Sequence, residues 1–217
     1  METRTGERAD GRVLRGDHTR RAVLRRAVDL ASVEGLDGLS IGRLAKELEI
    51  SKSGLFAHFG AKEELQLAAI RAARRIYADV VVAPALEAPP GLARIWALSE
   101  SWFGYSRSRV FPGGCFFARV GHEFGARTGR VHDALASASR EWLELIERSA
   151  EDARRSGELA AGTDPAQLAF EVNAFFDAAG TASLLHADDA AYDRARDAVR
   201  ARLRAAAAPG AVLPWTG

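Results

Sequence analysis

The stretch SIGRLAKELEISKSGLFAHFGAKEEL, residues 40–65, contains three short helical patterns in succession. Ser40 is a good N-cap for the first pattern, whose apolar residues recur at helical spacing. Ser51 can cap the second, in which Leu55 and Phe59 lie four residues apart and face inward. The opposite face of that helix is small and polar, so its backbone can approach the major groove of B-DNA closely. The stretch therefore predicts a helix-turn-helix.

The same residues follow the pattern L-A-x-x-L-x-[IV]-S-K-x-x-L-[YF]-x-H-F-x-x-K-E-x-L, which resembles the DNA-binding signature of the tetracycline-repressor (TetR) family. The resemblance covers roughly residues 20–67. It implies base-facing positions, phosphate-contacting positions and one position near the DNA backbone on the supporting helix. These DNA-binding candidates are Arg43, Lys52, Ser53, Phe56, Ala57, His58 and Lys62. The alternative is an ordinary three-helix packing unit whose basic residues are only solvated.

Three residues depart from the family pattern. Glu49 stands where the family usually has the turn glycine, and a positive φ at a non-glycine residue costs about 1 kcal/mol. Phe56 lacks the hydroxyl of the usual tyrosine. Ala61 replaces a capping serine, which forfeits roughly 1 kcal/mol. We expect DNA binding to be weakened by these changes but not abolished.

Composition limits the class of protein. The chain has 217 residues, 47% hydrophobic and 27% charged, with a formal net charge of +1, which is typical of a folded globular protein. Any DNA-binding surface must therefore come from local clustering of basic residues. No apolar run reaches the length of a membrane span, and the first residues lack the apolar core of a signal peptide. We expect a cytoplasmic protein with no membrane partner.

Candidate catalytic and metal-binding groups are sparse. The five histidines show none of the spacings of metal sites, and the single cysteine, Cys115, cannot form a disulfide within the chain. Cys115 and His122 could share a helix face, but the helical rise places them about 10 Å apart, beyond hydrogen-bond distance. We expect no enzymatic activity, no cofactor and no metal site.

Apolar periodicity, without strand-like alternation, divides the whole chain into helices. We expect an all-α fold of about nine helices, the number that the TetR resemblance implies. The first helix runs from about residue 17 to Gly35, and the fourth stops at Pro84. The later helices are expected over residues 91–107, 115–125, 128–156, 164–186 and 190–208. The domains are a flexible N-terminal arm, a DNA-binding domain, a connecting helix, a ligand-binding and dimerisation domain and a tail: residues 1–16, 17–60, 61–84, 85–208 and 209–217.

The arginine-rich arm could lie along phosphates or reach into a minor groove, or could be a solvated tail. Aromatic residues are concentrated in the C-terminal part. Most must form the core, but such crowding also suits a cavity for a flat or apolar ligand, oriented by polar groups such as His122 or Glu123. The ligand-binding candidates are Trp102, Phe103, Cys115, Phe116, Phe117, His122, Trp142, Asn173, Phe176 and Asp177.

The last two helices are predicted to form a four-helix contact between two subunits. The candidates for this interface are Phe170, Ala179, Gly180, Ser183, Leu184, Val199 and Leu203. The alternative is that this face packs within one subunit. A homodimer is favoured because a helix-turn-helix protein commonly needs two copies, about 34 Å apart, to read a palindrome.

These observations favour a dimeric, ligand-responsive repressor that a small, largely apolar effector releases from a palindromic operator in double-stranded DNA. Segment 111–117 is expected to border the cavity and to connect mechanically to the fourth helix. Two alternatives stay open. One is a sensor or interaction protein that keeps the fold but has weakened or lost specific DNA binding. The other is a thiol-based regulator, in which Cys115 follows a Pro-Gly-Gly break and the dipole of a new helix stabilises its thiolate.

Overall fold

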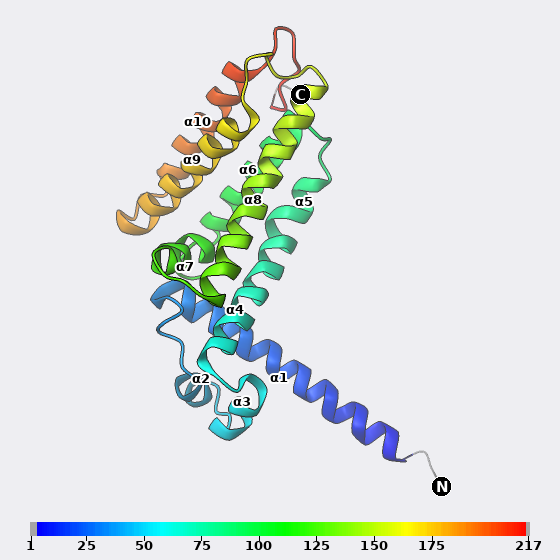
Figure 1. Ribbon diagram of the computed structural model, residues 1–217, viewed down its shortest axis with the longest axis vertical. Helices are drawn as coiled ribbons and strands as arrows, with labels where there is room; N and C mark the ends of the chain where they lie inside the picture. Colours follow the sequence, from blue (N-terminus) through cyan, green and yellow to red (C-terminus); the bar gives the residue numbers. More distant parts are fainter. Residues whose placement is uncertain (1–3, 216–217) are drawn as a thin grey trace.

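The computed structural model describes residues 4–215 of the chain, and side chains from residue 19 onward. Three helices form the N-terminal unit: α1 (Arg4–Glu34), α2 (Ile41–Glu47) and α3 (Lys52–Phe59) (Figure 1). Both predicted N-caps are confirmed. The Ser40 hydroxyl accepts a hydrogen bond from the backbone N–H of Arg43 at 3.1 Å, and the Ser51 hydroxyl accepts one from Gly54 at 3.1 Å. These bonds satisfy N–H groups that a helix leaves free at its start.

Helix α1 begins earlier than predicted. Its first residue is Arg4, well before residue 17, so the expectation of a flexible arm is wrong for residues 4–16. Residues 1–3 of that arm lie outside the described part of the chain. The stretch contains four arginines, which favour helix, and it lacks proline. Its three glycines, Gly6, Gly11 and Gly16, weaken the helix but do not interrupt it. Gly35 ends the helix with φ of 86°, as predicted.

The connecting helix continues through its predicted stop at Pro84. Helix α4 (Lys62–Tyr77) leads directly into a π-helical turn, η1 (Ala78–Val82), and then into α5 (Ala83–Leu86). In this turn the backbone N–H of Ala83 bonds to the carbonyl of Ala78, five residues earlier. Proline has no N–H, and its ring crowds the carbonyl four residues before it, so the wider turn accommodates Pro84 without ending the helix.

The C-terminal part is a bundle of five further helices: α6 (Leu92–Arg107), α7 (Phe116–Phe124), α8 (Arg130–Arg155), α9 (Pro165–Leu185) and α10 (Ala190–Ala206). With α4, η1 and α5 counted as one continuous helix, the described residues form nine helices and no strand, which confirms the predicted fold class. None of the described helices is both long and apolar enough to cross a membrane.

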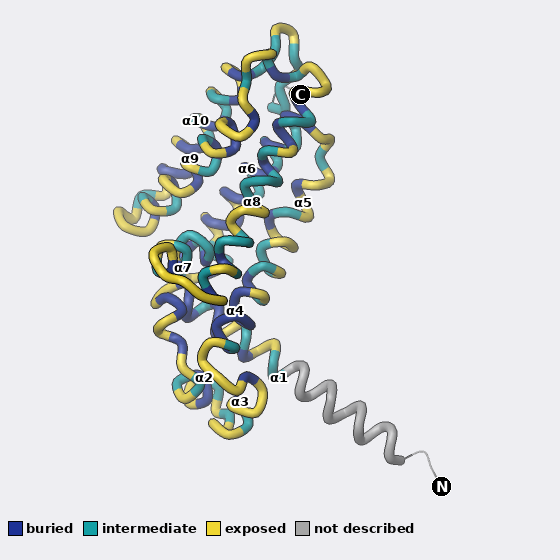
Figure 2. Tube along the Cα trace, in the orientation of Figure 1, coloured by how far each residue is buried: buried dark blue, intermediate teal, exposed yellow. Residues whose placement is uncertain are grey.

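One hydrophobic core runs through both parts of the molecule (Figure 2). Four residues predicted to lie at a subunit interface are buried in or beside this core: Ala179, Ser183, Val199 and Leu203. These four are wrong as interface residues because each is no more than 2% exposed within a single chain, where α9 packs along α10. Phe170 and Leu184 are 65% and 47% exposed, and Gly180 is partly exposed. The spacing of apolar residues predicts that two faces of α9 are apolar. It cannot show which of these faces packs against α10.

Candidate DNA-binding face and ligand pocket

The turn between α2 and α3 is strained at Glu49. Its φ is 55°, the left-handed conformation that usually requires glycine, as the sequence predicted. The next residue, Ile50, donates its backbone N–H to the carbonyl of Ala45 at 2.9 Å, which closes the turn. A glutamate can therefore occupy this turn, and the turn keeps the geometry that the helix-turn-helix needs.

Helix α3 presents one face to solvent at the lower end of the molecule in Figure 1. Leu55 and Phe59 are buried beneath it, as predicted. The five candidates on this helix are exposed: Lys52, Ser53, Phe56, Ala57 and His58. Phe56 is 55% exposed and so offers an apolar surface where a tyrosine hydroxyl would offer a hydrogen bond. The face has the shape and chemistry for a major groove.

The other two DNA-binding candidates are bound to neighbouring protein groups. The guanidinium of Arg43 bonds to the carboxylates of Glu34 and Glu47, and its hydrogen bond lowers the pKa of Glu34. Lys62 Nζ donates to the backbone carbonyl of Asp37 at 2.7 Å. Both side chains remain about half exposed, so a phosphate could still reach them. Neither side chain is free of protein partners, so a contact with DNA would share or replace these hydrogen bonds.

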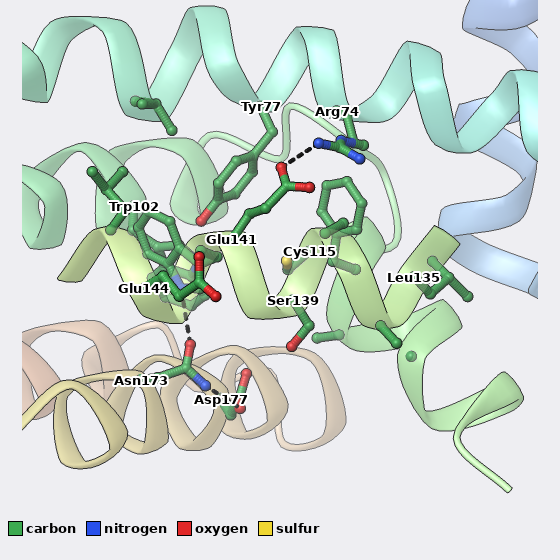
Figure 3. A pocket seen from close by; sticks show the side chains of 18 of the residues that line it. Arg74, Tyr77, Trp102, Cys115, Leu135, Ser139, Glu141, Glu144, Asn173 and Asp177 are labelled. Atoms are coloured by element: carbon green, nitrogen blue, oxygen red, sulfur yellow. Dashed lines mark hydrogen bonds and ion pairs between the residues drawn. The ribbon is translucent and has the colours of Figure 1, made fainter. Parts of the chain in front are cut away.

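A pocket of about 1040 Å³ lies among α4, α7, α8 and α9 (Figure 3). Seven of the ten ligand-binding candidates line it: Trp102, Cys115, Phe117, His122, Trp142, Asn173 and Asp177. The other three, Phe103, Phe116 and Phe176, are wrong as lining residues. They are at most 2% exposed and belong to the core behind the pocket, where Phe176 stacks on Trp102 with ring centroids 4.7 Å apart.

Several lining residues escaped prediction. Arg74, Tyr77, Val82 and Leu86 come from the continuous helix α4–η1–α5, which was predicted only to connect the two domains. The apolar stripe of this helix extends past its DNA-binding end, and this pattern could have predicted that the helix also lines a pocket. Charged residues of α8 also line the pocket: Glu141, Glu144 and Arg148.

Tyr77 is at the centre of an aromatic cluster beside the pocket. Its ring makes edge-to-face contacts with Tyr105, Phe117 and Trp142, with centroids between 5.3 and 5.7 Å apart. Burial raises the pKa of Tyr77 well above its ordinary value, so the hydroxyl stays protonated. Because such contacts hold rings at fixed angles, the cluster gives the pocket a stiff apolar wall.

Cys115 is the N-cap of α7 and lines the pocket. The predicted stabilisation of its thiolate is wrong, because burial raises the pKa of the thiol above its ordinary value. Hydrogen bonds from the backbone N–H groups of Ala118 and Phe117 oppose this shift but do not reverse it. Desolvation outweighs the helix N-terminus here, and the thiol is neutral.

A chain of hydrogen bonds orders the polar side of the pocket. The indole N–H of Trp142 donates to Asn173 Oδ1 at 3.0 Å, and Asn173 Nδ2 donates to Asp177 Oδ2 at 3.1 Å. Figure 3 draws both bonds as dashed lines: the first connects α8 to α9, and the second lies within α9. Since the indole can only donate, it fixes the orientation of the Asn173 amide and thereby aims the second bond at Asp177.

The face of α7 that points away from the pocket is bound to the DNA-binding unit. The Glu123 carboxylate accepts hydrogen bonds from the backbone N–H groups of Leu36 and Asp37, at 2.7 and 2.8 Å. Glu123 is therefore not a pocket group, contrary to the expectation. Nearby, Gly113 N–H donates to the Ser32 hydroxyl at 3.0 Å. A Cβ at Gly113 would lie 1.9 Å from the Ser32 carbonyl oxygen, so only glycine permits this approach.

Ion pairs reinforce this contact. Arg127, just after α7, bonds to the Asp37 carboxylate at 2.6 Å, and Arg130 bonds to Glu63 and Glu64 at the start of α4. Segment 111–117 thus borders the pocket as predicted, but α7 is tied to the end of α1 rather than mainly to α4. Its link to α4 is the ring contact between Phe117 and Tyr77.

Comparison with known proteins agrees with both parts of this structure. Residues 23–69 match the family model described as bacterial regulatory proteins, tetR family, and residues 91–199 match the tetracyclin repressor-like C-terminal domain. A search of curated protein sequences gave no significant match.

Solved structures share the fold. A TetR transcriptional regulator from Chloroflexus aurantiacus J-10-FL has a TM-score of 0.82 and 21% identity, covering 89% of this chain and 98% of that one. A protein from Saccharomonospora viridis in complex with choline has a TM-score of 0.75 and 20% identity, with coverage of 88% and 98%. AibR, in complex with isovaleryl coenzyme A and operator DNA, has a TM-score of 0.66 and 18% identity, with coverage of 82% and 94%. The chain belongs to the TetR family of transcriptional regulators.

Proposed function

We propose that this protein is a homodimeric repressor that a small, largely apolar effector releases from a palindromic DNA operator. The observation that carries the proposal is the position of α7. His122 lines the pocket, and the next residue, Glu123, holds the backbone of Leu36 and Asp37 in the DNA-binding unit. A ligand that displaces α7 would therefore displace the DNA-binding unit as well.

The energy required of an effector is modest. It must bind the arrangement that cannot bind DNA more tightly than the one that can. A hundredfold loss of operator affinity requires a difference of about 2.7 kcal/mol. A pocket of about 1040 Å³ with aromatic walls can supply such a difference, because a drug-sized ligand would be largely buried in it. The ligands bound to the Saccharomonospora viridis protein and to AibR support an effector site in this fold.

The dimer is proposed from the exposed face of α9. Phe170, Leu184 and Leu185 are 65%, 47% and 72% exposed in the single chain. A shallow hollow of small residues runs between α9 and α10, lined by Ala178, Ala182 and Ala198 among others. Two copies packed through this face would form a four-helix bundle and carry two α3 helices to successive major grooves. Such a protein would act in the cytoplasm, where bacterial DNA is.

Selection of bound sequences from a random pool of double-stranded DNA tests the proposal. We expect enrichment of a palindrome whose half-sites are recognised by α3, and loss of that enrichment with a Lys52→Ala, Ser53→Ala double variant. No enrichment with the intact protein would favour the other candidate, a sensor of this fold that has lost specific DNA binding.

A further inference from the structure

The positive and negative charges of the residues that line the pocket are not equal in number. Two arginines and three carboxylates face it. Arg74 pairs with Glu141, and Arg148 pairs with Glu144 at 3.5 Å. Asp177 remains, and none of the described lysine or arginine side chains forms an ion pair with it. With neutral histidines, the lining therefore has an excess of one negative charge.

The Nδ1 atoms of the two histidines of the lining are directed to groups other than Asp177. His122 Nδ1 lies 2.7 Å from the carbonyl oxygen of Ala118, which can only accept, so this nitrogen carries the proton of the neutral ring. His132 Nδ1 lies 3.0 Å from the Asp133 carboxylate and so is directed to a different acid. Burial raises the pKa of Asp177 and nearby His122 opposes that shift, but among the described residues neither histidine forms an ion pair with the Asp177 carboxylate.

The Asp177 carboxylate is held in one orientation, but only one of its two oxygens accepts a hydrogen bond from the described residues. Asn173 donates to its Oδ2 at 3.1 Å, and Trp142 holds that amide in place. No described residue donates a hydrogen bond to Oδ1. The negative charge also acts across the cavity. Burial is the largest cause that raises the pKa values of Tyr77 and Cys115, and the charge of Asp177 is a smaller cause of the same direction. Asp177 therefore faces the cavity that the aromatic residues enclose.

Aromatic rings line the same cavity: Tyr77, Trp102, Phe117 and Trp142. Aromatic faces attract cations, most strongly those of tryptophan, and recognition of quaternary ammonium groups uses such rings together. A fixed carboxylate with a free oxygen beside them adds a full negative charge. A neutral or anionic ligand would bring no positive charge to this carboxylate, whereas a cation would pair with it directly.

We infer that the effector is an organic monocation, with a tertiary or quaternary ammonium group at Asp177 and an apolar, ring-containing body. The cavity of about 1040 Å³ is far larger than an ammonium group alone, so the body must fill the space between α4 and α8. The inference rests on the proposed role of this pocket as the effector site.

Calorimetry without DNA tests the inference with three probes of similar size: trimethyl(3-phenylpropyl)ammonium, 4-phenylbutan-1-ol and 4-phenylbutyrate. We expect the cation to bind at least about tenfold more tightly than the alcohol, since both the Asp177 carboxylate and the aromatic faces attract its positive charge. The anion should bind most weakly. Equal affinities, preference for the anion, or no binding of the cation at millimolar concentration would each overturn the inference.

The Asp177→Asn variant tests whether this carboxylate causes the preference for the cation over the alcohol. It should weaken binding of the cation by roughly ten- to hundredfold and leave binding of the alcohol unchanged. Glu171→Gln is the matched control, because it removes one negative charge from the same helix, and Glu171 pairs with Arg202 outside the pocket. Asp177→Glu should retain the preference for the cation.

An equal loss for all three probes in Asp177→Asn would assign Asp177 a structural role and contradict the inference. These measurements do not involve DNA, so they separate the inference from the proposed function. A protein that binds the cation preferentially but enriches no DNA sequence would contradict the repressor proposal alone. One that enriches a palindrome but binds the three probes equally would sink the ammonium site alone.

Discussion

The Glu123 carboxylate of α7 accepts a hydrogen bond of 2.7 Å from the backbone N–H of Leu36, just after α1. Its other oxygen accepts from Asp37, so a single side chain satisfies two adjacent N–H groups of the DNA-binding unit. Leu36 is held from a second side, since the Gln66 side chain donates to its carbonyl at 3.0 Å. The turn after α1 is therefore positioned jointly by α4 and α7.

We expect Glu123→Gln to lower the free energy of unfolding by about 1 to 2 kcal/mol, because an amide has only one acceptor oxygen for two donors. It should also reduce the effect of an effector on operator affinity, since α7 would hold the DNA-binding unit less firmly. Urea denaturation measures the first effect. Operator titrations with and without effector measure the second.

Glu87→Gln is a suitable control for that variant, because Glu87 is exposed and its side chain has no bonded partner among the described residues. If Glu123→Gln were as stable as this control and responded to effector like the wild type, the contact between α7 and α1 would not transmit the signal.

The stability of the DNA-binding unit should depend on pH through Asp37. A hydrogen bond from Arg127 lowers the pKa of this carboxyl below its ordinary value of 3.8. A lowered carboxyl pKa gives stability that is present above the unfolded value and is lost as the pH falls through the folded value. The contribution is below about 1 kcal/mol because the pair is half exposed. Asp37→Asn should flatten the acid limb of the stability curve below pH 4, measured by thermal melts. An unchanged acid limb would contradict this role.

The sequence determined the N-terminal unit well because its signals are local. Ser40, Ser51 and Glu49 each act within four residues of chain, and all three have the predicted roles. The pocket was only partly predictable because neighbours on one helix can face different environments. Phe117 lines the cavity, while the adjacent Phe116 is in the core. Only the packing of α7 against α8 and α1 separates the two, and no spacing within α7 shows it.

Lys62 and Lys52 should affect DNA binding differently. Lys62→Ala should weaken binding to every sequence alike and reduce the salt slope by about one, because its predicted partner is a phosphate. Its ammonium group has three donors, so the bond to the Asp37 carbonyl leaves two for a phosphate. Lys52→Ala, on the exposed face of α3, should change the preferred bases. Fluorescence anisotropy across a salt series and a panel of operators measures both. A changed base preference with an intact salt slope in Lys62→Ala would reverse the assigned roles.

Phe170→Glu should convert the dimer to monomers. Phe170 is 65% exposed in the single chain, so the variant should fold normally, but an unpaired carboxylate buried between subunits costs several kcal/mol. Leu184→Glu should act in the same direction. Sedimentation velocity gives the mass, and circular dichroism checks the fold. A folded Phe170→Glu protein that still sediments as a dimer would exclude this end of α9 from the interface.

Cys115 allows a direct test of whether occupation of the pocket controls DNA binding, without knowledge of the effector. It is the single cysteine of the chain and lines the pocket. Burial raises its pKa, so attachment of a benzyl group by a methanethiosulfonate reagent needs a long incubation at alkaline pH.

Operator affinity of the benzyl-modified protein, measured against Cys115→Ser treated in the same way, is the deciding measurement. We expect modification to weaken binding to the selected operator by about a hundredfold, and the treated Cys115→Ser protein to bind like the untreated one. A folded, fully modified protein that binds the operator as tightly as the unmodified protein would show that occupation of the pocket does not control DNA binding.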